Sequence, residues 1–141
     1  MKPRVLDEMA SVVTRLKEDF HLSLTDEDFA FARDELLHVF LHEACHAALY
    51  RAIPWLLRLH DDEHVLIDEV LARILESDLA PAFGLTPHTV EEHMEEFSRY
   101  DLKFPLSAEQ YVHLADVWRE RYGASRDVAA FAEYARKYLL G

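Results

Sequence analysis

One pattern in the chain has a specific chemistry attached to it: His42-Glu43-Ala44-Cys45-His46, which matches H-E-x-x-H. Residues four apart in a helix lie one turn apart on the same face, so the imidazoles of His42 and His46 can hold one zinc ion together. Glu43 is the next residue round the helix, where its carboxylate can take a proton from a water bound to the metal. The pattern therefore predicts a zinc-dependent hydrolase, with His42 and His46 as ligands and Glu43 as general base.

The residues that flank the motif are apolar, which predicts that its helix is largely buried. Two histidines and a glutamate in a buried helix are costly unless something pairs with them, and a metal ion would do so. The alternative is a core helix whose histidines and glutamate hydrogen-bond to neighbouring side chains. Cys45 points away from both histidines on the helix, so we interpret it as a small core residue and not as a ligand.

Helices are the elements that would position the motif. Thr25, followed by three acidic residues, predicts the start of a helix that continues to Ile53, because Pro54 would end it. Apolar residues at three- and four-residue spacing predict further helices over residues 5–20, 61–78, 86–97, 107–122 and 125–139. Residues 100–106 instead alternate with period two, which predicts one short edge strand. We therefore expect a mainly α, compact single domain over residues 1–141, with about six helices.

A catalytic zinc ion needs a third protein ligand, which we expect on the helix that follows the motif. H-E-x-x-H followed by a glutamate on the next helix resembles the zincin metallopeptidases, in particular the gluzincins, whose third ligand is a glutamate. In several gluzincin branches that glutamate is followed by two residues and then a small one, as in Glu69-Val70-Leu71-Ala72. The resemblance implies that His42, His46 and Glu69 hold zinc, that Glu43 is the general base, and that the reaction is peptide hydrolysis.

The helical wheel offers a different third ligand. Glu63 falls near the centre of the apolar face of its helix, whereas Glu69 lies on the flank, so Glu63 or His64 would be the donor if that face met the motif helix. Asp68 is a further carboxylate in the same segment. Some gluzincin branches also carry an aspartate, which holds a ligating histidine, at the position of Arg73. Glu35 or Asp68 would have to take over that role in this chain.

The same residues can be divided in another way. Glu35-x-x-His38 and Glu43-x-x-His46 are both E-x-x-H, the ligand pair of di-iron helical bundles. Those bundles need the two pairs on different helices that face each other, whereas here both pairs share one predicted helix. A third interpretation is a non-catalytic helical domain, in which Glu43 does no chemistry.

Composition limits the classes of partner. The net charge of −12 argues against nucleic acid or an anionic membrane as the main partner, because both require a basic surface. Cys45 is the only cysteine, so no intramolecular disulfide can form. The first residues do not resemble a signal peptide, and no apolar run approaches the length of a membrane span. We therefore expect a cytoplasmic protein, and the gluzincin resemblance implies that it acts on a peptide or protein substrate.

Overall fold

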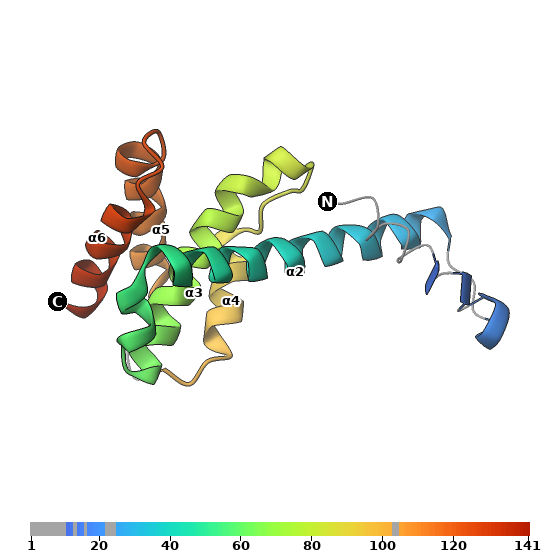
Figure 1. Cartoon of the computed structure of the whole chain (residues 1–141), viewed down its shortest axis with the longest axis horizontal. Coiled ribbons are helices and arrows are strands. Elements are labelled where there is room, and N and C mark those ends of the chain that lie inside the picture. The colour runs from blue at the N-terminus through green and yellow to red at the C-terminus, as the bar shows by residue number, and fades with distance from the viewer. Residues whose placement is uncertain (1–10, 13, 16, 22–24, 103–104) are drawn as a thin grey trace. The chain divides into compact units, whose positions relative to one another are not determined.

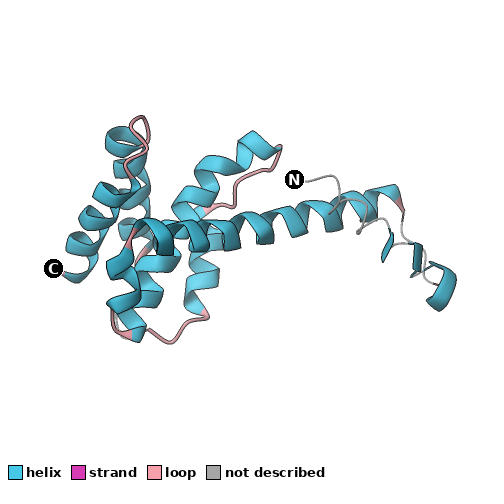
Figure 2. Cartoon of the chain, viewed as in Figure 1, coloured by secondary structure: helices cyan, strands magenta, loops and turns pink. Residues whose placement is uncertain are grey.

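The structure is a computed structural model, and it describes residues 11–12, 14–15, 17–21, 25–102 and 105–141. The residues that it describes form helices joined by loops, with no strand among them (Figure 2). This confirms the prediction of a mainly α fold. Contacts between Cα atoms divide the chain into two units, Met1–Leu41 and His42–Gly141, and each is described by itself. The single domain over residues 1–141 stays a prediction.

Unit 1 contains the first part of α2 (Asp26–Ala52), which continues into unit 2 as one helix (Figure 1). Its start directly after Thr25 and its end just before Pro54 confirm the long motif helix. The helix predicted over residues 5–20 lies partly outside the described residues, and those of its residues that are described are helical. Neither α2 nor any other helix in the described part of the chain is long and apolar enough to cross a bilayer.

Unit 2 is built around α3 (Asp61–Leu79), which packs against both neighbouring 3-10 helices and against α6. The other elements are η1 (Pro54–Arg58), η2 (Ala80–Phe83), α4 (Val90–Ser98), α5 (Ala108–Val117), the π-helix η3 (Trp118–Tyr122) and α6 (Val128–Leu140) (Figure 1). The core of the unit consists of fully buried apolar side chains, among them Leu49, Ile53, Leu56, Leu66, Ile67, Val70, Leu71, Leu114 and Phe131. The packing of these side chains positions α3 so that its acidic residues reach the histidines of α2.

Capping residues set where the helices of unit 2 begin. The predicted helix start at residue 107 is confirmed, because Ser107 and Gln110 form a capping box at the start of α5. The predicted start of α4 near Thr86 is wrong, because Thr89 accepts a hydrogen bond from the Glu92 backbone N–H at 3.1 Å and donates its own backbone N–H to the Glu92 side chain at 2.9 Å. The last helix likewise begins later than predicted, at Val128, after a cap by Asp127.

The prediction of a strand over residues 100–106 is wrong for the residues that are described, and Lys103 and Phe104 lie outside them. A strand needs a partner strand to pair its backbone groups, and the described chain offers none. Tyr100, Leu102, Pro105 and Leu106 of this segment instead line a cavity of about 280 Å³, together with Met94 and Phe97 of α4. The described apolar residues of the segment therefore contact a helix and not a neighbouring strand.

Candidate metal centre

Three side chains of unit 2 converge on one point. His42 and His46 lie one turn apart on α2, and their Nε2 atoms are 2.9 Å apart. Glu69 reaches the same point from α3, with Oε1 3.2 Å from His46 Nε2 and Oε2 3.4 Å from His42 Nε2. The structure thus brings together the two histidines predicted from their spacing and the glutamate implied by the gluzincin resemblance. All of these donor atoms lie within 4.8 Å of one another.

The outer nitrogens of both histidines are held by carboxylates of α3. Nδ1 of His42 donates to Glu76 Oε2 at 2.8 Å, and Nδ1 of His46 donates to Asp68 Oδ1 at 2.8 Å. Since a carboxylate can only accept, each Nδ1 carries the proton, and in the neutral tautomer each Nε2 presents its lone pair to the centre. Carboxylate–histidine pairs of this kind orient the ligands of protein metal sites.

The distances between the donor atoms of His42, His46 and Glu69 can be compared with those around a zinc ion. Two lone pairs and a carboxylate meet within 3.4 Å, an arrangement that is repulsive unless a proton or a metal ion lies between them. With bonds of about 2.1 Å and tetrahedral angles, donors on one zinc ion lie about 3.4 Å apart. The Nε2–Nε2 distance is about half an ångström shorter than this, and both histidine–carboxylate distances match it closely. The donor set therefore fits a zinc-sized ion after a small spreading of the two rings.

The electrostatics of the centre favour a bound cation. Hydrogen bonds with Glu69 and Glu76 raise the pKa of His42 to about 9. Burial opposes the charging of His46, but hydrogen bonds with Asp68 and Glu69 outweigh it and raise the pKa to about 10. At 2.9 Å there is room for one proton between the two Nε2 atoms, so without metal the pair holds one proton at neutral pH. A metal ion would have to displace that proton.

Glu69 is kept ionised by its neighbours. Burial alone would raise the pKa of Glu69, but hydrogen bonds with His42 and His46 and the charge of Arg73 hold it well below its usual range. Nη2 of the buried Arg73 lies 3.2 Å from Glu69 Oε2, and its guanidinium lies over the Phe97 ring, 5.4 Å from the centroid. Arg73, which the gluzincin resemblance matched to an aspartate that holds a histidine, forms an ion pair with Glu69 instead.

The carboxylate oxygen of Asp68 that does not contact His46 has partners of its own. Its Oδ2 accepts a hydrogen bond from the Tyr50 hydroxyl at 2.6 Å, and His64 Nε2 lies 3.6 Å from the same oxygen. His64 in turn donates Nδ1–H to the Leu56 carbonyl at 2.8 Å. Asp68 therefore takes the histidine-holding role that the sequence left between Glu35 and Asp68, and His64 faces Asp68 and not the centre.

The alternative third ligand, Glu63, makes no ion pair with either histidine of the centre among the described residues. The wheel argument assumed that the apolar face of α3 meets α2. In the structure that face is buried in the core of unit 2, where α3 packs on α6, and the polar flank with Glu69 faces the histidines. The di-iron arrangement also lacks its geometry, because both E-x-x-H pairs lie on α2.

Glu43 is exposed on α2, one residue along from His42. Burial and the hydrogen bond with Asp68 raise the pKa of Tyr50 most, and the negative charge of Glu43 adds to this effect. An exposed carboxylate beside a buried donor set is positioned to exchange protons with solvent.

The motif helix is buried on one side only. Cys45 is 5% exposed and burial raises the pKa of its thiol to about 11, which confirms it as a core residue. The expectation of a largely buried helix is wrong for the opposite side, where small side chains are exposed: Ala44, Ala47 and Ala48. Two larger apolar residues that precede the motif, Val39 and Phe40, are exposed as well, at 59% and 63%.

Sequence reasoning missed Glu76. The signal was its position seven residues after Glu69, which places both carboxylates on one face of α3 two turns apart.

No protein-family model matches the chain, and it matches neither a curated protein nor a solved structure. The geometry of the centre therefore carries the functional interpretation.

Proposed function

We propose that this chain is a zinc-dependent hydrolase that cleaves peptide bonds, with His42, His46 and Glu69 holding the metal and Glu43 as general base. One observation carries the proposal. Both histidines give their Nδ1 protons to carboxylates and turn their Nε2 atoms, 2.9 Å apart, toward a third ionised carboxylate. Two neutral imidazoles and one carboxylate are a donor set of catalytic zinc sites.

Each residue of the centre has a task in this reaction. A zinc ion in such a site polarises a carbonyl group and lowers the pKa of a water molecule toward neutrality. Asp68 and Glu76 keep the histidines in the tautomer that can bind a metal. Glu43, exposed beside them, accepts the proton of the attacking water and returns it to the leaving amine. Peptides are the proposed substrates because of the resemblance to gluzincins.

The described residues contain no sheet edge with which a peptide backbone could pair. Gluzincins usually align a peptide substrate along such an edge. Helices and loops around the centre would have to hold the substrate here, by contacts between side chains. The substrate panel should therefore contain short peptides together with simple amides and esters, which need no such alignment.

The first test is the metal content of the purified full chain, measured by elemental mass spectrometry. We expect about one zinc ion per chain in the wild type and none in His46→Ala. The matched control is His60→Ala, because His60 is exposed and makes no side-chain cap at the start of α3. Absence of zinc after purification in zinc-containing buffer would leave His42 and His46 as a proton-sharing core pair and overturn the proposal.

Two pairs of glutamate variants then separate the roles. Glu69→Gln should lose zinc while Glu63→Gln retains it, and the reverse would restore the helical-wheel assignment.

Glu43→Gln should retain zinc and lose about 10²–10⁴-fold in hydrolysis, as expected for a general base. Glu109→Gln, in the first turn of α5, is the control. A Glu43→Gln variant with full turnover, or a zinc-loaded wild type inert toward every substrate, would mark a non-catalytic metal-binding domain.

A further inference from the structure

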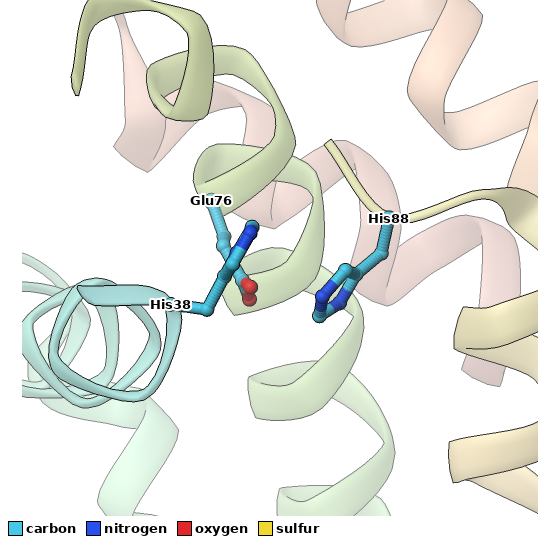
Figure 3. Close-up of side chains that lie close together, drawn as sticks. All are labelled: His38, Glu76 and His88. Carbon is cyan, nitrogen blue, oxygen red and sulfur yellow. The ribbon is translucent and has the colours of Figure 1, made fainter. Parts of the chain in front are cut away.

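The large apolar side chains of the two units differ in exposure. In unit 2 most of them form the core, and polar side chains lie in groups such as Glu76 and His88, where a carboxylate oxygen and a ring nitrogen are within 4.8 Å of each other (Figure 3). In unit 1, Leu41 is the only buried apolar residue among those whose burial the structure describes. Six large apolar residues of unit 1 are instead exposed by 50–69%: Val12, Phe20, Phe31, Leu36, Val39 and Phe40. A concentration of exposed apolar residues of this kind marks an interaction surface.

Three of these residues form one continuous face of α2. Successive residues of a helix turn by about 100°, so Leu36, Val39 and Phe40 project within an arc of about 100°. Their exposed fractions are 50%, 59% and 63%. We call Leu36, Val39 and Phe40 the α2 patch. Ala32, which is also exposed, projects within the same arc one turn earlier and leaves space for a neighbouring helix.

The α2 patch lies in a run without charged residues. No Asp, Glu, Lys or Arg occurs from Leu36 to Leu41, although 30% of the chain is charged, and Glu35 and Glu43 bound the run on its two sides. The cores of protein interfaces are depleted in charged residues, and interfaces between identical chains are more apolar than those between transient partners. The composition of the patch therefore favours a second copy of this chain as the partner.

The exposed apolar area of unit 1 is close to what a stable dimer needs. A phenylalanine contributes about 150–250 Å² when it becomes buried. Phe20, Phe31 and Phe40 are exposed by 67%, 69% and 63%, and Val12, Leu36 and Val39 by 50–59%. Together the six side chains offer on the order of 600 Å² per copy. A standard interface buries about 800 Å² per partner, so the polar residues around the apolar ones need to add only the remainder.

We propose that unit 1 forms a homodimer, in which the α2 patch packs against the same patch of a second copy. A two-fold axis makes such an interface self-complementary and closed. The two α2 helices run antiparallel, because parallel helices would place the acidic first turns, Asp26–Asp28, beside each other and align the helix dipoles. The dimer depends on unit 1 alone, and it requires neither a bound metal nor hydrolysis.

The first test is the mass of the full chain in solution as a function of its concentration, measured by analytical ultracentrifugation. We expect a reversible dimer, and Phe40→Glu should raise its dissociation constant at least about tenfold by placing two buried charges at the interface. The matched control is Phe83→Glu in η2, because Phe83 is 52% exposed and belongs to unit 2. This control should stay within about threefold of the wild type. Circular dichroism checks that both variants keep their helices.

Three outcomes of the ultracentrifugation would overturn the proposal. One is a wild type that stays monomeric up to about 100 μM. Another is a folded Phe40→Glu variant that dimerises as the wild type does, or a Phe83→Glu control that loses the dimer equally. The last is growth into larger open assemblies, which a closed two-fold interface does not allow.

Cross-linking then tests which face meets its copy. Cys45 is 5% exposed, so an added surface thiol is the reactive one. Val39→Cys should form a covalent dimer with a short bis-maleimide, whereas Phe83→Cys, the control in unit 2, should not. An added thiol at position 39 that reacts with a simple maleimide but gives no covalent dimer would overturn the proposal. A monomeric Val39→Cys whose thiol is protected from maleimide would mean that another part of the same chain covers the patch, and it would overturn the proposal as well.

Discussion

At the scale of single residues, the neighbours of two histidines determine which ring nitrogens face the candidate metal centre. Asp68 and Glu76 each accept an Nδ1 proton at 2.8 Å and thereby determine which nitrogen faces the centre. The Tyr50 hydroxyl donates to Asp68 Oδ2 at 2.6 Å, and Arg73 Nη2 lies 3.2 Å from Glu69 Oε2. The H-E-x-x-H motif alone specifies no tautomer. The carboxylates of α3 specify it.

The first prediction concerns the charge of these outer partners. Asp68→Asn keeps the shape of the side chain but removes the charge that holds His46, so zinc affinity should fall by about 10–100-fold. Competition with a chromogenic zinc chelator measures the change. Asp61→Asn, an exposed change in the first turn of the same helix, is the control and should leave affinity unaltered. Unchanged affinity in Asp68→Asn would show that the Asp68–His46 hydrogen bond does not orient a ligand.

These residues differ in how far they could be predicted from the sequence. His42 and His46 could be predicted because helical spacing alone places them on one face. Glu69 needed the gluzincin resemblance, since the helical wheel favoured Glu63. Glu76 was missed because α3 carries many acidic residues, and only the position of α2 decides which of them meets a histidine.

At the scale of elements, short-range signals were the reliable ones. The start of α2 after Thr25 and the start of α5 after Ser107 depend on residues within one turn, and both are confirmed. The start of α4 was wrong because two competing signals lie three residues apart, and the reciprocal hydrogen bonds of Thr89 and Glu92 determine it. The predicted strand was wrong because strand pairing depends on a distant partner that the sequence does not reveal.

The second prediction tests which threonine begins α4. Thr89→Ala removes the hydroxyl that accepts from the Glu92 N–H, so the free energy of unfolding should fall by about 1 kcal/mol. Thr86→Ala, at the position that the sequence pattern favoured, should change it by less than about 0.5 kcal/mol. Urea unfolding followed by circular dichroism measures both. Equal losses in the two variants would contradict the cap seen at Thr89.

At the scale of the whole of unit 2, the helix α3 contributes residues to three different regions. The apolar face of α3 forms the core, Glu69 and Glu76 contact the histidines of the candidate metal centre, and Ser77 and Asp78 line a cavity of about 430 Å³. A helix that is buried all round must satisfy its polar groups, and α3 does so through ion pairs and hydrogen bonds to α2, α4, α5 and η3. Stability of the unit should therefore depend on the protonation of these polar contacts.

His93 makes this dependence measurable. Burial, followed by the nearby charge of Arg73, lowers the pKa of His93 to about 4 from an ordinary value of 6.5. Above pH 6.5 His93 is neutral in both the folded and the unfolded chain, so its contribution is constant there. Below that pH His93 becomes protonated in the unfolded chain but stays neutral in the folded chain. The free energy of unfolding therefore falls as the pH falls toward 4.

The third prediction follows from this sign. Between about pH 7.5 and pH 4.5, the wild type should lose about 2 kcal/mol more unfolding free energy than His93→Gln, which cannot titrate. The raised pKa values of His42 and His46 cancel in this difference, because the wild type and the His93→Gln variant carry the same two histidines. Urea unfolding with a chelator present measures the two curves. Parallel curves would mean that folding does not lower the pKa of His93.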